Sequence, residues 1–217
     1  TIQHSISKRR VSPCPVCQSS ENCGIIPLSK KDGYADNIRL KKERKGRNNM
    51  AKIYENAVPG LVIRQAQEED CAAILELIWG IAKYEKLEHQ VVATEESLRE
   101  SIFVRRRADV LLAEYEGKTV GYALYFYNFS TFIGRENLYL EDIFVLPEMR
   151  GKGIGKALLT CVAGIAVEQG CSRMDWVCLD WNTPSQKFYQ SMGAQPHPEW
   201  LLFRAEGDAL EKLAETK

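Results

Sequence analysis

The residues with the clearest chemical potential form one glycine-rich segment, Arg150-Gly-Lys-Gly-Ile-Gly-Lys156. Glycines at alternate positions let a backbone turn tightly and direct successive N–H groups toward one point. A series of apolar residues with helical spacing follows at once, so the segment should open a helix, whose N-terminus carries partial positive charge. The sequence therefore predicts a phosphate-binding site here.

Two common phosphate-binding motifs do not fit this segment. A dinucleotide-binding fingerprint would place its third glycine where Lys156 stands, and a P-loop would need Gly-Lys-Ser/Thr after four intervening residues. A turn without any ligand is the remaining alternative. It is disfavoured because glycines cost conformational entropy that a plain turn would not require.

The elements around this segment must position it. Residues 138–145 read as a strand that Pro147 ends, and the helix after it should run to about Gly170. Its apolar face consists of Ile154, Leu158, Leu159, Val162, Ile165 and Ala166. Strand, glycine turn and helix are thus contiguous.

The flanking sequence predicts further α/β units. We expect strands at 61–64 and 173–179, a hairpin of 110–115 with 119–129, and a last strand at about 200–205. Helices should follow the acidic residues 68–70, begin at the cap Thr94 and run to about Phe103, begin again at the cap Thr183, and close the chain. Pro184 and Gly193 would bracket the helix that Thr183 caps.

Charge divides the chain into two parts. Residues 1–49 hold 11 of the 29 Lys and Arg residues but only 4 of the 29 Asp and Glu residues, so an acidic body follows a basic extension. The extension has few large apolar residues, and we predict that it is largely disordered. Two other functions stay open for it: a zinc site using Cys14, Cys17, Cys23 and His4, and nucleic-acid binding through residues 41–47.

Composition excludes some classes of protein. No apolar run reaches the roughly 18 residues of a membrane span, and no secretory signal is evident at the N-terminus, so we expect a cytoplasmic protein. Nucleic-acid binding is disfavoured because the basic run lacks interleaved aromatic residues. We expect no bound metal.

At this point the chain resembles a known family. The loop at 150–155 is similar to the pyrophosphate loop of GCN5-related N-acetyltransferases (GNAT), and residues 61–205 match that family's element order. The segments that resemble its diamine/polyamine branch, spermidine/spermine- or thialysine-type, are Ala82-Lys-Tyr-Glu85, Leu138-Tyr-Leu-Glu-Asp-Ile-Phe-Val145, Trp181-Asn-Thr-Pro-Ser185, Phe188-Tyr189 and Met192-Gly-Ala194. The resemblance implies a mixed, mostly antiparallel sheet that is flanked by helices and splayed between its fourth and fifth strands. Residues 50–217 would form this acetyltransferase domain.

The resemblance also implies acetyl-CoA as cosubstrate and assigns residues to it. The pantetheine arm would lie along the strand that holds Ile143, Phe144 and Val145, and the residues at 182–185 would lie on its other side. The predicted cofactor-binding residues are Ile143, Phe144, Val145, Arg150, Gly151, Lys152, Gly153, Ile154, Gly155, Lys156, Asn182, Pro184, Ser185 and Tyr189. A helix-capping role for Asn182 stays open.

Two residues are candidates for proton transfer. Attack of an amine on a thioester expels a thiolate, and the phenol of Tyr189 could protonate it, as the tyrosine at this position is proposed to do in related enzymes. The alternative for Tyr189 is a buried aromatic residue of the core. Glu141 could take the proton of the substrate ammonium, and Asp142 could hold the cation. Alternation would put these two neighbours on opposite faces unless the strand bulges.

The remaining predicted residues belong to the amine side. By resemblance the substrate-binding residues are Tyr84, Glu85, Glu141, Asp142, Asp175, Trp176, Val177 and Trp200. A core position is an equal alternative for Trp200. Polyamine-acetylating members typically have Asp-Pro-Trp where this chain has Ser130-Thr-Phe132, and the Ser-Thr variant looks more like thialysine-type enzymes. Short diamines or lysine-like amines are therefore expected over long polyamines.

We thus expect an acetyl-CoA-dependent N-acetyltransferase that forms a ternary complex with a small cationic amine and works as a homodimer. A route through an acetylated cysteine is disfavoured because no cysteine stands in a Cys-His signature. The alternatives are a protein or peptide N-acetyltransferase and a non-catalytic acyl-CoA-binding regulatory module.

Overall fold

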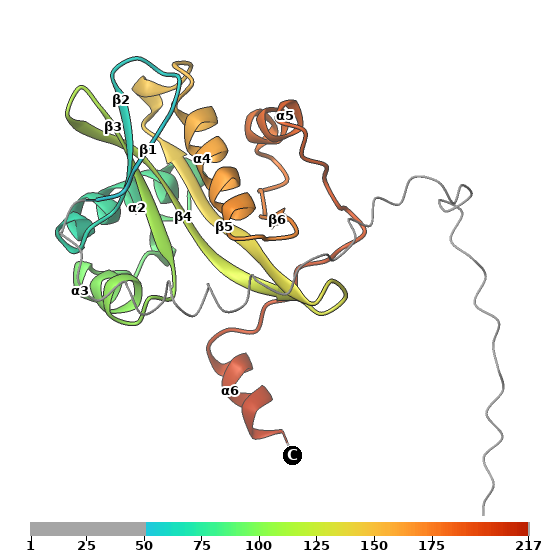
Figure 1. The fold of residues 1–217 in the computed structure, drawn as a ribbon. Coiled ribbons are helices and arrows are strands. Elements are labelled where there is room, and N and C mark those ends of the chain that lie inside the picture. The colour runs from blue at the N-terminus through green and yellow to red at the C-terminus, as the bar shows by residue number, and fades with distance from the viewer. Residues whose placement is uncertain (1–50, 217) are drawn as a thin grey trace, which may run out of the picture. The chain divides into compact units, whose positions relative to one another are not determined.

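A computed structural model describes residues 51–216 of the chain (Figure 1). Its six strands form one sheet in the order β1-β2-β3-β4-β5-β6. The strands are β1 (Ile53–Tyr54), β2 (Leu61–Gln65), β3 (Asp109–Tyr115), β4 (Lys118–Ser130), β5 (Arg135–Val145) and β6 (Met174–Asp175). Neighbouring strands are antiparallel except β5 and β6, which are parallel, so the sheet is mixed as expected.

Helices cover both faces of the sheet. They are α2 (Cys71–Glu85), α3 (Glu95–Leu98), α4 (Ile154–Glu168), α5 (Thr183–Ser191) and α6 (Asp208–Glu215). Short helical turns lie at Glu68–Asp70, Glu88–Gln90 and Pro147–Met149, and a π-helical turn at Arg99–Val104 extends α3. The architecture is α/β, as the sequence predicts.

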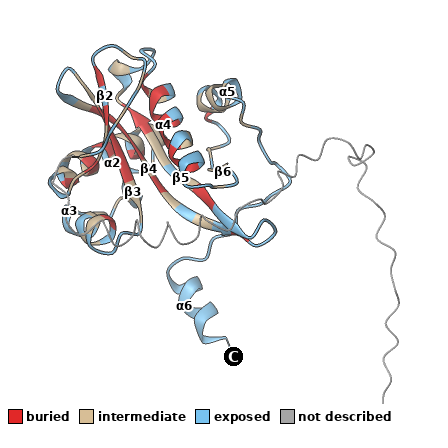
Figure 2. Ribbon diagram, in the orientation of Figure 1, coloured by how far each residue is buried: buried red, intermediate tan, exposed pale blue. Residues whose placement is uncertain are grey.

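The core consists of two apolar clusters, one on each face (Figure 2). One cluster joins the apolar face of α4, including Leu158 and Val162, to Leu138 and Leu140 of β5. The other joins Ile74 and Leu77 of α2 to Tyr122 of β4 and Phe144 of β5. Burying each such side chain contributes about 1.5–3 kcal/mol, so these helices are fixed by packing on the sheet.

Several predicted elements are confirmed. The hairpin of β3 and β4, the strand and helix on either side of residues 150–153, and the terminal helix α6 all form. The cap of α5 lies one residue earlier than predicted, because the Asn182 side chain rather than that of Thr183 accepts the Ser185 N–H, at 3.3 Å. Pro184 is accordingly the second residue of that helix.

The strand expected at 173–179 is shorter than predicted. Only Met174 and Asp175 pair with β5, opposite Leu138 and Tyr139. The chain then turns, because the Asn182 N–H and the Gln186 side chain both donate to the Leu179 carbonyl, at 3.0 Å each. Pairing between β5 and β6, the fourth and fifth strands of the predicted count, therefore stops at Tyr139.

The strand expected at 200–205 is absent from the described chain. Residues 200–205 belong to no helix or strand, and Trp200, Leu201, Leu202 and Phe203 are exposed. A strand forms only where its backbone pairs with a neighbouring strand, and residues 200–205 pair with none of the six strands of the described chain.

Within residues 51–216 no helix is long and apolar enough to cross a membrane. The positions proposed for zinc or nucleic-acid binding, at residues 4–23 and 41–47, lie outside the described residues.

Candidate functional site

The glycine loop, residues 150–156, joins the turn after β5 to the first turn of α4. Gly151 and Gly153 adopt positive φ angles of 78° and 83°, which side-chain-bearing residues rarely adopt. Gly153 is the N-cap of α4, and because glycine has no capping side chain, the first N–H groups of the helix stay unsatisfied there. These two positions explain why glycine occurs here.

The loop leaves its backbone donors free. Among the described residues, the first N–H group after Arg150 with a protein acceptor is that of Ala157, which donates to the Gly153 carbonyl at 2.9 Å. The N–H groups of residues 151–156 are thus available at the positive end of a 15-residue helix. This arrangement fits a pyrophosphate, and Lys152 and Lys156 are exposed beside it.

The edge of β5 next to the loop is also free. Because β6 pairs only with Leu138 and Tyr139, residues 140–145 have no strand partner on that side within the described chain. Ile143 and Val145 pack on the α4 face, and Phe144 packs on the α2 face. An extended ligand could therefore bind along β5 and bring its end to residues 150–156.

Three predicted residues from different elements meet beside this edge. The Tyr84 hydroxyl of α2 donates to Asn182 Oδ1 at the start of α5, at 3.0 Å. The Arg150 guanidinium lies over the Tyr84 ring, with Cζ 4.5 Å from the ring centroid, and Arg150 Nε donates to the Val145 carbonyl at 3.1 Å. Tyr84, predicted for the amine side, and Asn182, predicted for the cofactor side, thus form one contact.

The strand β5 bulges at Glu141. Tyr125 is opposite Leu140 while its neighbour Leu124 is opposite Asp142, so Glu141 is an extra residue in β5. Leu138 and Leu140 before the bulge, and Ile143 and Val145 after it, all contact the α4-side cluster. Glu141 and Asp142 therefore both lie on the α2 face, and the condition set for bringing these neighbours together is met.

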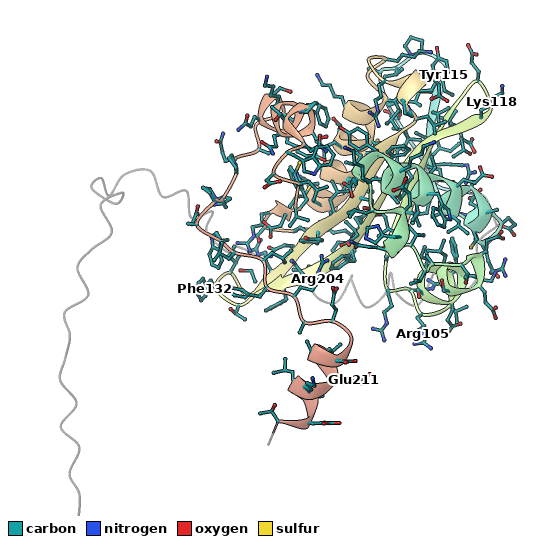
Figure 3. The ribbon with its side chains drawn as sticks, turned by 180° about the vertical axis from the view of Figure 1, so that it is seen from behind. Arg105, Tyr115, Lys118, Phe132, Arg204 and Glu211 are labelled. Carbon is teal, nitrogen blue, oxygen red and sulfur yellow. The ribbon has the colours of Figure 1, made fainter. Side chains whose placement is uncertain are left out.

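The carboxylate of Asp142 interacts with those of Glu85 and Glu141, and we call these three the carboxylate cluster. Partial burial raises the pKa of Glu85 and of Glu141, and the Asp142 charge raises both further. Burial also raises the pKa of Asp142, while the hydrogen bond from Tyr122 opposes this rise. The charge of Arg204, which is labelled in Figure 3, lowers the pKa of Glu141, whereas the charge of Asp142 raises it.

Tyr189 faces the same cluster from α5. Its ring lies 5.2 Å from the Trp176 ring and 5.4 Å from the Phe188 ring, centroid to centroid. Burial raises its pKa, and the charges of Cys178, Glu85 and Asp142 add to the rise. Because its pKa is raised, the hydroxyl is protonated at neutral pH. Within residues 51–216 it has no hydrogen-bond partner, so a ligand could accept a hydrogen bond from it.

The other predicted residues lie at various distances from this centre. Trp176 contacts Tyr189, but the Asp175 carboxylate pairs with Arg173 at 2.8 Å, and Val177 is exposed. Trp200 is 75% exposed, so its place in the amine site stays a prediction. Pro184 and Ser185 lie in the first turn of α5 beside Asn182.

Sequence reasoning did not include Tyr122 among the site residues. This side chain is fully buried in β4, and its hydroxyl donates to Asp142 Oδ2 at 2.8 Å. Its position in the strand before residues 138–145 could have indicated that it lies near the two carboxylates. Regular alternation, however, does not tell whether its hydroxyl would bond to Glu141 or to Asp142.

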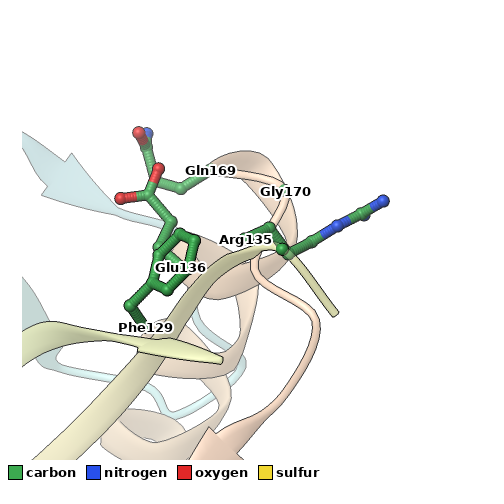
Figure 4. A pocket seen from close by; sticks show the side chains of 6 residues that line it. Phe129, Arg135, Glu136, Gln169 and Gly170 are labelled. Atoms are coloured by element: carbon green, nitrogen blue, oxygen red, sulfur yellow. The ribbon is translucent and has the colours of Figure 1, made fainter. Parts of the chain in front are cut away.

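Two hollows of the described chain lie away from the carboxylate cluster. One, of about 390 Å³, is lined by Phe129, Gly134, Arg135, Glu136, Gln169 and Gly170. Figure 4 shows Glu136 and Gln169 on one side of it and Arg135 pointing away. It contains no predicted site residue. The other, of about 220 Å³, is lined in part by Lys118, Met149 and Lys152, beside the glycine loop.

The chain is similar to known acetyltransferases in sequence and in fold. The model of the acetyltransferase (GNAT) family matches residues 62–194. The chain is 43% identical over 166 residues to thialysine N-epsilon-acetyltransferase of Bos taurus, covering 71% of this chain and 97% of that protein. It is 31% identical to L-ornithine N5-acetyltransferase NATA1 of Arabidopsis thaliana, covering 70% and 86%. The aminoglycoside N-acetyltransferase AAC(6')-Iy, solved in complex with CoA, shares the fold with a TM-score of 0.56 at 21% identity, covering 70% and 97%.

Proposed function

This chain belongs to the acetyltransferase (GNAT) family, and we propose that it transfers an acetyl group directly to a primary amine of a small cationic substrate. It is an N-acetyltransferase, and acetyl-CoA is its cosubstrate. The proposal adds the substrate class and the ternary complex, in which amine and acetyl-CoA are bound together.

The carboxylate cluster is the observation that supports this substrate class. Three acidic side chains from α2 and β5 lie near one another: the Asp142 charge raises the pKa of Glu85 and of Glu141, and the Arg204 charge lowers that of Glu141. Gathering negative charge in a partly buried place is unfavourable unless a cation offsets it. An alkylammonium group would provide that cation.

The residues have complementary roles in this reaction. Acetyl-CoA supplies a thioester, whose C–S bond breaks as the C–N bond to the amine forms. An amine with a pKa near about 10 is mostly protonated at neutral pH, so Glu141 accepts a proton from it, directly or through water. Asp142 holds the ammonium group before transfer. Tyr189 donates a proton to the sulfur that leaves, and the second proton that the nitrogen loses as the amide forms restores the phenol.

The cosubstrate would be held by the groups described above. Arg150 and the N–H groups of residues 151–156 would bind the pyrophosphate, and the free edge of β5 at Ile143 and Val145 would bind the pantetheine arm. Asn182, Pro184 and Ser185 would bound the arm on the α5 side. Binding along β5 brings the thioester near Glu141 and Tyr189, so no acetylated cysteine is needed.

Short, lysine-like amines are the substrates that we favour. The relatives described above are named for thialysine and ornithine, each of which carries a side-chain amine. Ser130 at the end of β4 and Phe132 in the turn that follows carry no carboxylate, so this segment offers no negative charge to a long polyamine.

Assembly, location and domain organisation complete the proposal. We propose a homodimer, supported by the exposed apolar run of residues 200–203. A cytoplasmic location accords with the four free cysteines of the described chain, Cys71, Cys161, Cys171 and Cys178. We assign catalysis to residues 50–217 and treat 1–49 as an extension, since the family match at 62–194 lies within the former.

A substrate panel tests the proposal. The release of free CoA would be measured with acetyl-CoA and thialysine, ornithine, lysine, a short diamine, spermidine and lysine-containing peptides. We expect the highest kcat/KM with a short or lysine-like amine. Turnover with peptides alone would favour a protein acetyltransferase, and no turnover with any amine would leave only a binding module.

A further inference from the structure

The hydroxyl of Tyr122 is the one polar group of a side chain that is otherwise part of the core. The ring packs on the α2 face with Leu112 and Phe144, and the residue has no exposed surface. A buried hydroxyl without a partner would cost about 1–3 kcal/mol. Among residues 51–216 its only hydrogen-bond partner is Asp142 Oδ2, at 2.8 Å, so the position of the hydroxyl and that of the carboxylate depend on each other.

The Asp142 carboxylate is held at one oxygen only. Within the described residues Oδ1 of Asp142 has no hydrogen-bond partner. The bulge at Glu141 places Asp142 on the α2 face, and the ring of Tyr122 cannot move because the core surrounds it. The carboxylate is therefore fixed in orientation, with one oxygen left for a ligand.

We propose that Tyr122 is the positioning residue of the amine site: its hydroxyl orients the Asp142 carboxylate so that Oδ1 receives the ammonium group of the substrate. This inference rests on the proposed function, because it assigns Asp142 to the cation. Tyr122 touches neither the amine nor the thioester, and it acts through Asp142.

Several titratable or charged groups lie near Asp142. Glu85 lies at the end of α2, and Glu141 immediately precedes Asp142 in β5. Tyr189 faces Asp142 from α5, and Arg204 lowers the pKa of Glu141. Burial disfavours the charged form of Asp142, whereas the Tyr122 hydrogen bond favours it. Removing the hydroxyl should therefore raise the pKa of Asp142, and with it the pH below which the amine binds poorly.

The test is Tyr122→Phe, which removes one oxygen and keeps the ring. Initial rates with thialysine would be measured against pH, and the Asp142 carboxyl carbon would be titrated by NMR in the same variant. We expect the KM for thialysine to rise about fivefold at neutral pH, and the acid limb of kcat/KM and the Asp142 titration to move up by about one pH unit. The kcat should stay within about twofold.

Tyr125→Phe is the matched control, because Tyr125 is also buried in β4 but packs on the α4 face. Asp142→Asn is the second variant: it should remove the acid-limb shift, so that adding Tyr122→Phe changes the profile no further. A Tyr122→Phe profile that superimposes on that of Tyr125→Phe would overturn the proposal, as would an unchanged KM in Asp142→Asn.

The outcomes separate this inference from the proposed function. If the native protein acetylates no small amine, the function is wrong. The NMR titration still tests the coupling of Tyr122 to Asp142, and an unshifted Asp142 titration overturns that coupling. If the native protein acetylates thialysine but Tyr122→Phe behaves as the control does, only the role of Tyr122 is wrong.

Discussion

At the scale of single residues, Tyr189 has the environment of a proton donor. Burial and the nearby charges of Glu85 and Asp142 raise its pKa, so the phenol is protonated at neutral pH. Its ring is fixed against Trp176. A protonated phenol with a fixed ring suits a general acid that must give one proton to the leaving sulfur at a defined position.

Tyr189→Phe should lower kcat by about 10²-fold, because a positioned general acid typically contributes about 10²–10⁴-fold. The Phe ring keeps the contacts with Trp176 and Phe188, so CoA affinity measured by calorimetry should stay within about twofold. Tyr125→Phe, remote from the carboxylate cluster, is the control. A kcat equal to that of the native protein would show that Tyr189 only packs.

At the scale of elements, residue types predict the strand and the helix around the glycine loop but not the bulge. Period-two alternation separates Glu141 from Asp142, and the sequence alone could state only the condition under which they come together. The bulge results from the pairing of β4 with β5, in which Leu140 and Asp142 are opposite consecutive residues. That register depends on tertiary packing of both faces, so Tyr122 could not be matched to Asp142 from the sequence.

The glycine loop gives a prediction for one element. Gly153→Ala should weaken CoA binding about tenfold, because a positive φ of 83° costs an alanine about 1–2 kcal/mol and its Cβ would lie 3.4 Å from Val58 Cγ2. The N–H groups at the start of α4 would then shift. Calorimetric titration with CoA measures the effect without any amine.

Gly134→Ala is the matched control for the loop. Gly134 lies in the β4–β5 turn with a φ of 73°, and a Cβ there would meet no atom within 4 Å. This variant has similar backbone strain but should leave CoA affinity unchanged. Equal losses in the two variants would mean that strain, and not the loop's donors, determines binding.

At the scale of the whole molecule, the segment after α5 differs most from expectation. Its apolar residues suit a strand, yet residues 200–205 pair with nothing in the described chain, and α6 after them is exposed throughout (Figure 2). Residue types give a segment its propensity to form a strand, but the strand forms only where another strand is available to pair with it. Local patterns therefore predict the sheet from β2 to β5 and fail where the strand depends on a partner.

The exposed run of residues 200–203 gives the last prediction, that its partner is a second copy of the chain. Side chains of Trp200, Leu201, Leu202 and Phe203 are 69–87% exposed, and contiguous apolar surface of this kind usually marks an interface.

Sedimentation should give twice the 24.6 kDa chain mass for the native protein. Leu201→Ser with Phe203→Ser should shift it to the monomer, whereas Val92→Ser, an isolated exposed position, should not. A native monomer at micromolar concentration, or a double variant that stays dimeric, would contradict this assignment and leave Trp200 without the cover that its place in the amine site requires.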